Sequence, residues 1–247
     1  MNKLNIQAIF DSIDGECNGF QGAGQLTTFI RLKGCNLSCR WCDTKYAQNP
    51  KPENWMAIDE IVEQIHFPKV TITGGEPLLQ RTNLLPLVEI LLTDGYSITI
   101  ETNGTEPPFA EIDTSFRELR YVVDFKLPSS GMTKRMNSLA FSDLNSMDII
   151  KFVILDKEDY DFARCVIFEH PNWIARKVFS PAVKIKYIYA NTWGEFEQPD
   201  TVIPKRLCIV NDEWPRQLAE MMIRDRVPAQ FSLQLHKILW PDAKEER

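Results

Sequence analysis

The chain has 247 residues, of which 44% are hydrophobic and 25% are charged, a length and balance that suit one large folded domain rather than a disordered chain. Its formal net charge of −6 at pH 7 argues against a nucleic-acid groove, because such grooves depend on basic residues that face phosphates. No stretch reaches the roughly 18 uninterrupted apolar residues of a membrane span, and the first residues lack a signal-peptide pattern. We therefore expect a cytoplasmic protein that acts on a small molecule, with no membrane or nucleic-acid partner.

Short runs rich in β-branched and aromatic residues alternate along the chain with amphipathic segments. In chain order they predict a strand at 27–33, a helix at 58–65, a strand at 69–73, a helix at 84–92, strands at 96–101, 120–126 and 148–154, helices at 156–169 and 213–226, and a strand at 230–236. Strands that alternate with helices favour a parallel sheet covered by helices. The predicted fold class is α/β, with a full or partial βα barrel as its natural closure.

One domain over residues 1–247 accommodates this pattern, since the chain shows no internal repeat and no low-complexity tract. The polar segment 191–206 contains Pro and Gly, and we interpret it as a surface excursion rather than a linker. In barrels of this kind the reactive residues lie at the carboxyl ends of the strands. The turn at 74–77, the sequence TNGT at 102–105 and His236 all occupy such positions.

Three of the six cysteines lie within the sequence GCNLSCRWCDT, at Cys35, Cys39 and Cys42. In a reducing compartment, cysteines are more often metal ligands, reactive groups or buried residues than disulfide partners. Structural zinc normally takes four ligands, and the three histidines lie far from this cluster in the sequence. Three soft thiolates instead suit an iron–sulfur cluster in which one iron has no protein ligand.

Two other interpretations of the triad remain open at this point. One is a zinc site completed by a remote group, and the other is a chance grouping of buried cysteines. The remaining cysteines are scattered, and we interpret them as buried structural residues: Cys17, Cys165 and Cys208.

The second motif is TITGGEP at 71–77, where two glycines directly follow a predicted strand. Glycine lets the backbone approach a ligand closely, and Pro77 restricts the turn. Glu76 offers a carboxylate that can bind an amine. A thiol triad followed by such a turn is a much more specific signal than either motif alone.

With these two motifs the chain resembles the radical S-adenosylmethionine (SAM) superfamily, in which C-x3-C-x2-C holds a four-iron cluster and a GGEP-type turn binds SAM. Further stretches narrow the resemblance to the 7-carboxy-7-deazaguanine synthase family over nearly the whole length: SIDGE, FIRLKGCNLSCRWCDTKYA, TGGEPLLQ, ETNGT, DFKLPSSG, KFVI and LQLHKILWP. The resemblance implies an incomplete, partial TIM-type barrel of the radical SAM kind. It also implies a lyase that converts 6-carboxy-5,6,7,8-tetrahydropterin to 7-carboxy-7-deazaguanine with release of ammonia, in queuosine and deazapurine biosynthesis.

The resemblance also implies cofactors and partners. They are a 4Fe-4S cluster, SAM and Mg²⁺, with the radical generated on SAM rather than on a catalytic side chain. Members of the family are homodimers and need an electron donor such as flavodoxin or ferredoxin.

By resemblance, each role falls on particular residues of this chain. Cys35, Cys39 and Cys42 hold the cluster, and the Thr44 hydroxyl binds Mg²⁺. Contacts with SAM are expected from Trp41, Asp43, Gly75, Glu76, Asp124 and Lys126. Contacts with the pterin are expected from Ile13, Asp14, Gly15, Glu16, Arg31, Thr73 and His236. Arg31 is the residue expected to meet the substrate carboxylate, since an inward guanidinium is unfavourable unless it meets an anion.

The chain departs from the family pattern in three places. Asp14 and Cys17 stand where Gln and Gly are common, and an ionised Asp cannot donate the hydrogen bond that an amide donates. The stretch 17–24 is longer than expected. The charged tail PDAKEER argues against a role for the C-terminal carboxylate at the substrate.

Two rival functions are compatible with part of the pattern. A glycyl-radical activating enzyme shares the triad and the GGEP turn, but it needs neither a pterin-type loop nor a magnesium threonine. A non-catalytic zinc-binding module shares only the cysteines.

Overall fold

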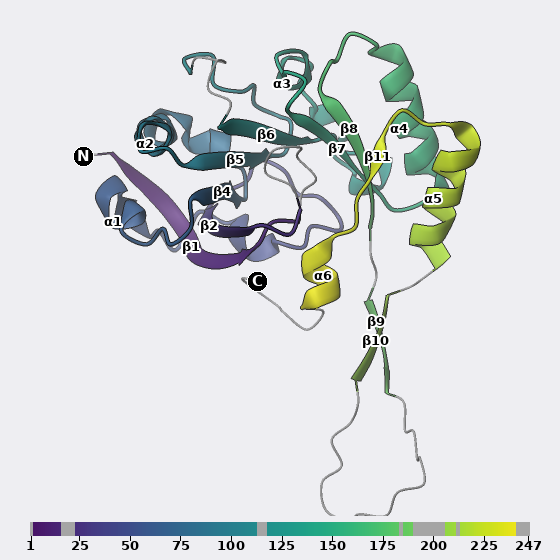
Figure 1. The fold of residues 1–247 in the computed structure, drawn as a ribbon, viewed down its shortest axis with the longest axis horizontal. Coiled ribbons are helices and arrows are strands. Elements are labelled where there is room, and N and C mark those ends of the chain that lie inside the picture. Colours follow the sequence, from purple (N-terminus) through teal and green to yellow (C-terminus); the bar gives the residue numbers. More distant parts are fainter. Residues whose placement is uncertain are drawn as a thin grey trace, which may run out of the picture.

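The fold is built on an open sheet whose strands come from both ends of the chain (Figure 1). The computed structural model describes residues 2–15, 23–112, 118–182, 185–189, 206–210 and 213–240. Within this part, nine strands pair in the order β11-β8-β7-β6-β5-β4-β2-β1-β3. They are β1 Lys3–Ile13, β2 Leu26–Leu32, β3 Trp55–Ala57, β4 Lys69–Gly74, β5 Ser97–Thr102, β6 Leu119–Asp124, β7 Ile149–Ile154, β8 Arg176–Pro181 and β11 Gln230–Phe231.

The strands from β2 to β11 in this order run parallel, and only β1 is antiparallel to its two neighbours. The sheet does not close on itself, because β11 and β3 are its two outer strands. This arrangement confirms the predicted α/β class and the partial barrel. A separate antiparallel pair, β9 Ile185–Tyr189 and β10 Arg206–Val210, projects away from the sheet (Figure 1).

Helices pack on the outer face of the sheet and form the core with it. They are α1 Ile58–Val62, α2 Arg81–Thr93, α3 Leu139–Ser142, α4 Lys157–Glu169 and α5 Glu213–Asp225, and a short α6 Leu235–Leu239 lies apart from this layer (Figure 1). Buried Leu87 and Leu91 of α2 and Ala163 of α4 belong to one apolar cluster with Ile72 and Phe152 of the strands. None of the described helices is long and apolar enough to cross a membrane.

The two faces of the parallel strands differ in polarity. In β4, Val70 and Ile72 belong to the apolar cluster, whereas Thr73 lines a cavity on the opposite face. Successive side chains of a strand point to opposite faces, so the alternation places polar groups on the inner face of the barrel. The inner face is therefore available for a polar site, while the helices cover the apolar one.

Most predicted elements are confirmed within a few residues, and the last predicted strand is wrong over most of its length. Instead of a strand at 230–236, only Gln230–Phe231 pairs with β8. The chain then turns, and the Lys237 N–H donates to the Gln234 carbonyl at 3.0 Å as α6 begins. His236 therefore lies on a helix and not at a strand end. Strands β1, β3 and β8 and the β9–β10 pair were not predicted.

One of the scattered cysteines is also placed differently from the prediction. Cys165 is exposed on α4, because Ala163 and Val166 occupy the buried side of this helix and Cys165 lies away from it. Cys17 lies outside the described residues, and for Cys208 only the backbone is described. Residues 191–205 of the expected surface excursion and the tail at 241–247 are also outside the described part.

Candidate active site

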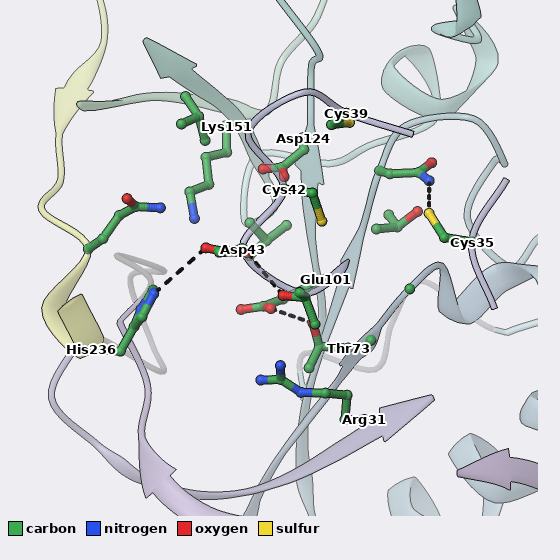
Figure 2. Close-up of a pocket in the computed structure, with 18 of the residues that line it drawn as sticks. Arg31, Cys35, Cys39, Cys42, Asp43, Thr73, Glu101, Asp124, Lys151 and His236 are labelled. Atoms are coloured by element: carbon green, nitrogen blue, oxygen red, sulfur yellow. Dashed lines mark hydrogen bonds and ion pairs between the residues drawn. The ribbon is translucent and has the colours of Figure 1, made fainter. Parts of the chain in front are cut away.

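A cavity of about 460 Å³ opens on the inner face of the sheet (Figure 2). Residues of five neighbouring parallel strands line it, four of them near the carboxyl end of the strand and Lys151 in the first half of β7: Arg31, Thr73, Glu101, Asp124 and Lys151. Ile13 and Gly15 from the end of β1 and residues of α6 line it as well. The carboxyl ends of parallel strands are the usual position of active sites in such folds, and the motifs found in the sequence meet there.

Cys35, Cys39 and Cys42 all line this cavity and are free thiols. Burial raises the pKa of Cys35, although the Leu37 N–H and the Asn103 amide, 3.5 and 3.6 Å from its sulfur, lower it. Burial likewise raises the pKa of Cys39, against the lowering effect of the Lys126 ammonium. The net pKa shift of Cys35 and of Cys39 is upward, and the donors beside Cys35 and the Lys126 ammonium beside Cys39 partly offset it in favour of the thiolate, which is the form that binds metal.

The arrangement of these thiols fits a cluster better than a single zinc ion. Within the described part of the chain, no group of three His, Cys, Asp or Glu side chains could hold one metal ion. Structural zinc needs four ligands on one ion, whereas each cysteine of an iron–sulfur cluster binds a different iron and the sulfurs need not converge. The zinc alternative therefore has no support among the described residues.

The two glycines of the GGEP turn pack directly against other backbone. A Cβ on Gly74 would lie 2.2 Å from the Leu32 carbonyl oxygen, and one on Gly75 would lie 2.1 Å from the Gly34 carbonyl oxygen. The Glu76 N–H donates to the same Gly34 oxygen at 2.8 Å. Only glycine fits here, and the turn is thereby held against the residue that precedes Cys35.

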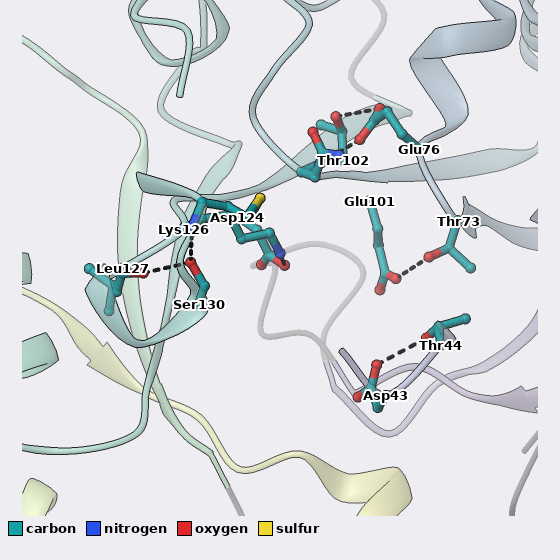
Figure 3. Close-up of polar contacts among 12 residues, drawn as sticks. Asp43, Thr44, Thr73, Glu76, Glu101, Thr102, Asp124, Lys126, Leu127 and Ser130 are labelled. Carbon is teal, nitrogen blue, oxygen red and sulfur yellow. Dashed lines mark hydrogen bonds and ion pairs between the residues drawn. The ribbon is translucent and has the colours of Figure 1, made fainter. Parts of the chain in front are cut away.

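The Glu76 side chain is fully buried and does not line the cavity. Its carboxylate accepts hydrogen bonds from the Leu78 N–H at 3.0 Å, the Thr102 hydroxyl at 2.7 Å and the Asn103 N–H at 2.6 Å (Figure 3). Burial raises its pKa to about 7 against these three bonds. From the sequence we expected this carboxylate to bind an amine. In the structure it points toward β5.

Arg31 lies across the cavity from Cys39 and Cys42, below Thr73 in Figure 2. Its guanidinium donates to the Tyr46 hydroxyl and lies over the rings of Phe10 and Tyr46, 5.1 and 5.6 Å from their centroids. Its Nε is buried and has no hydrogen-bond partner among the described residues. Beside it, the Thr73 hydroxyl donates to Glu101 at 2.7 Å (Figure 3).

Asp43 connects the cysteine loop with α6. Its carboxylate lies 3.2 Å from Lys237 Nζ and 4.0 Å from His236 Nε2, and it accepts a bond of 2.9 Å from the Thr44 hydroxyl. Burial raises the pKa of Asp43, but the charges of Lys237 and His236 outweigh it and hold that pKa below its usual range. Burial lowers the pKa of His236 to about 4 although Asp43 raises it, so its imidazole is neutral near pH 7.

Asp124 and Lys126 form an ion pair of 2.6 Å at the end of β6, close to Cys39 (Figure 3). Burial lowers the pKa of Lys126, whereas Asp124 and Cys39 raise it by more, so the net shift of this pKa is upward. Trp41 also lines the cavity, and its indole N–H donates to the Ser129 hydroxyl at 2.9 Å. The expected SAM-contacting residues other than Glu76 are thus all on the cavity.

Asp14 is fully buried and is not on the cavity. Its carboxylate forms an ion pair with Lys69 and accepts a bond of 3.4 Å from the Thr71 hydroxyl. A buried carboxylate requires such a partner, so Asp14 faces the interior and pairs with Lys69, and its expected contact with the pterin stays a prediction. Its neighbours Ile13 and Gly15 do line the cavity, whereas Glu16 lies outside the described residues.

Several cavity residues were not predicted from the sequence: Tyr46, Gln48, Glu101, Asn103, Lys151, Gln234, Lys237 and Trp240. Lys151 follows the logic that singled out Arg31, since it lies between Ile150 and Phe152 in a predicted strand, and Glu101 is a charged residue at the end of another predicted strand. That signal was present and was not applied to them. The others lie on loops or on α6, where spacing alone does not indicate which side chain faces a cavity.

Comparisons with known proteins agree with this geometry. The family model described as the Radical SAM superfamily matches residues 29–125. Curated proteins named 7-carboxy-7-deazaguanine synthase from Koribacter versatilis and Chlorobaculum tepidum are each 34% identical, over 98% of this chain and 99% and 96% of their own lengths. The crystal structure of QueE from Escherichia coli superposes with a TM-score of 0.65 at 21% identity and covers 94% of each chain, which supports the fold.

Proposed function

Since this chain belongs to the 7-carboxy-7-deazaguanine synthase family of the radical SAM superfamily, we propose that it converts 6-carboxy-5,6,7,8-tetrahydropterin to 7-carboxy-7-deazaguanine and ammonia. One arrangement supports this proposal most strongly. The cavity carries three free thiols at one end and a guanidinium with an unused buried N–H at the other. It is thus suited to hold a cluster and an anionic substrate together.

The residues present fit a 4Fe-4S cluster and SAM. Cys35, Cys39 and Cys42 would hold the cluster, and Gly75, which lines the same cavity, would contact SAM. When bound, the cluster and SAM supply the electron and the 5′-deoxyadenosyl radical for removal of a hydrogen atom from C6 of the pterin, which initiates ring contraction. The contribution of the protein is binding and orientation.

Arg31 is the residue proposed to bind the substrate carboxylate. Its guanidinium is oriented by Tyr46 and Phe10, and its buried Nε costs free energy unless it meets an acceptor. A carboxylate accepts from two guanidinium nitrogens at once, and such a bond would satisfy Nε.

Thr44 is proposed to bind Mg²⁺ through its hydroxyl oxygen. That hydroxyl donates its hydrogen to Asp43 at 2.9 Å, so its lone pairs remain for a hard cation, which prefers oxygen ligands and retains water. The substrate carboxylate would complete the site, so that Mg²⁺ and Arg31 together fix the orientation of the pterin.

The remaining partners are proposed on family grounds. The protein is proposed to be a homodimer, to receive electrons from a donor such as flavodoxin or ferredoxin, and to be located in the cytoplasm. Residues 1–247 are proposed to form one radical SAM domain. The absence of a spanning helix among the described residues is compatible with that location.

The test is anaerobic incubation of the reconstituted protein with dithionite, SAM, Mg²⁺ and carboxytetrahydropterin. We expect deazaguanine formation that stops when Mg²⁺ is removed by a chelator. If SAM is cleaved but no deazaguanine forms, the substrate assignment is wrong. Turnover that is independent of Mg²⁺ would contradict the role of Thr44.

A variant tests the carboxylate site. Arg31→Met should raise KM for the pterin at least about tenfold, because it removes a charge-assisted pair, and should leave KM for SAM unchanged. The matched control is Arg135→Met, an exposed arginine that does not line the cavity.

A further inference from the structure

The side chain of Gln234 contains a buried hydrogen-bond acceptor that has no donor among the described residues. The residue is 9% exposed and lines the cavity. Its side-chain carbonyl oxygen is buried and has no hydrogen-bond partner among the described residues. Buried amide oxygens are almost always paired in folded proteins, so this oxygen indicates a missing donor.

The side chain is not needed to hold its own helix. Gln234 occupies the N-cap position of α6, but its side chain makes no capping hydrogen bond. Its main chain is anchored separately, since its carbonyl accepts from the Lys237 N–H at 3.0 Å and the Ser232 N–H donates to Phe179 of β8 at 3.0 Å. The backbone thus fixes the position of an amide whose oxygen serves no structural bond.

Gln234 lines the cavity beside residues that are proposed to meet the pterin. The next residue, Leu235, is the nearest neighbour of Gly15, whose missing Cβ would lie 3.8 Å from the Leu235 nitrogen. His236 follows on α6, and Figure 2 shows His236 across the cavity from Cys35. The unused oxygen therefore belongs to a residue whose chain neighbours lie beside Gly15 and include His236, both of which are proposed to meet the pterin.

We propose that Gln234 is a specificity-determining residue whose carbonyl oxygen accepts a hydrogen bond from an N–H group on the ring of the substrate. This inference rests on the proposed function and extends it. A tetrahydropterin ring carries several N–H donors, whereas Arg31 binds only its carboxylate. Gln234 thereby distinguishes a nitrogen-rich ring from other cyclic carboxylates, because a ring without that donor leaves the buried oxygen unpaired.

Two substitutions separate the acceptor from the donor role of the amide. Gln234→Met keeps the length of the side chain and removes both roles, while Gln234→Glu keeps oxygen acceptors and removes the donor. Binding of carboxytetrahydropterin to the reconstituted holoenzyme with SAM, without reductant, is measured by anaerobic calorimetry, and KM values for the pterin and SAM are measured in turnover. Leu239→Ala, on an exposed position of the same helix that does not line the cavity, is the control.

We expect Gln234→Met to weaken pterin binding and raise its KM about tenfold, with KM for SAM unchanged, and Gln234→Glu to bind within about threefold of wild type. The control should bind as wild type does. If the wild type binds pterin and Gln234→Met binds it equally well, the proposal is overturned while the proposed function stands. Equal losses in both variants would also overturn it, because they assign the contact to the amide N–H. If the wild type binds no pterin, the proposed function fails and this inference fails with it.

Discussion

At the scale of single residues, the site depends on Gly75 and Glu76, whose tasks no other side chain performs. Gly75 brings the GGEP turn against the Gly34 carbonyl, and Glu76 ties the same turn to the end of β5. Neither residue acts through an exposed functional group. Both determine where the backbone lies next to Cys35, and each supports a prediction.

Gly75→Ala should lower the free energy of unfolding by about 3 kcal/mol and reduce iron incorporation, because the new Cβ meets backbone that no rotamer change can move. The Cβ would lie 2.1 Å from the Gly34 oxygen. Chemical denaturation of the apoprotein and iron analysis after reconstitution measure the two effects. Gly15→Ala is the stability control, since its nearest neighbour is 3.8 Å away; equal stability of the two variants would contradict the packing argument.

Glu76 should make stability depend on pH. Burial raises its pKa from 4.5 to about 7, so between these values the folded protein holds a proton that the unfolded chain has released, and stability falls as pH rises. Glu76→Gln removes this titration. Relative to wild type, the variant should therefore gain about 2 kcal/mol of stability between roughly pH 5.5 and pH 8.

Urea denaturation of the two apoproteins at both pH values measures that difference. Glu63→Gln, at an exposed position of the chain, controls for the loss of one carboxylate and should follow wild type. A constant difference between wild type and Glu76→Gln would show that Glu76 does not titrate in this range.

At the scale of elements, the cysteine loop is docked on the loop after β6, which is in turn anchored to α4. Trp41 donates to Ser129, and the Ser129 hydroxyl donates to the buried Asp159 at 2.5 Å. Asp159 also accepts the Leu155 N–H at 3.0 Å. This chain of bonds transmits the position of α4 to the residue between Cys39 and Cys42.

Ser129→Ala should raise KM for SAM about three- to tenfold and leave KM for the pterin unchanged, because Trp41 loses its partner at the proposed SAM end. The loss of a partner for Trp41 should also change the near-ultraviolet circular dichroism of the apoprotein. Ser138→Ala is the control, as that serine is exposed and makes no capping bond. If both the KM for SAM and the circular dichroism spectrum were unchanged in Ser129→Ala, the hydrogen bonds from Trp41 through Ser129 to Asp159 would have no positioning role.

At the scale of the whole molecule, the cavity is built from both ends of the chain. Ile13 and Gly15 follow β1, while Gln234, His236, Lys237 and Trp240 come from the last described residues, and the cysteine loop lies between them in sequence. The open sheet leaves one side of the barrel without strands, and α6 lies at the edge of the cavity (Figures 1 and 2). The three cysteines and the α6 residues therefore come from separate segments of the chain, which meet where Lys237 pairs with Asp43.

Removal of residues 233–247 should leave iron loading near the wild-type level but weaken pterin binding by at least about tenfold, because it removes Gln234 and His236, which are proposed to meet the pterin, and keeps the three cysteines of the cluster. Iron analysis and anaerobic calorimetry measure the two properties. Removal of 241–247 alone is the control and should keep both, in line with the expectation that the charged tail does not reach the substrate. Loss of iron in the longer truncation would show that the two ends are not independent.

The sequence by itself determined the alternation of strands and helices in the central part of the chain, the cysteine triad, the glycine turn and the family, because these depend on local spacing and on residue types with narrow chemical roles. Arg31 and Thr73 were also predictable, as polar residues on strands with a definite inner face. Only the tertiary structure decided that Asp14 pairs with Lys69, that Glu76 faces β5, and that Gln234 and His236 approach the cavity from a helix. The direction of a polar side chain on a turn or loop depends on which partner from a distant segment lies beside it, and spacing along the chain does not contain that information.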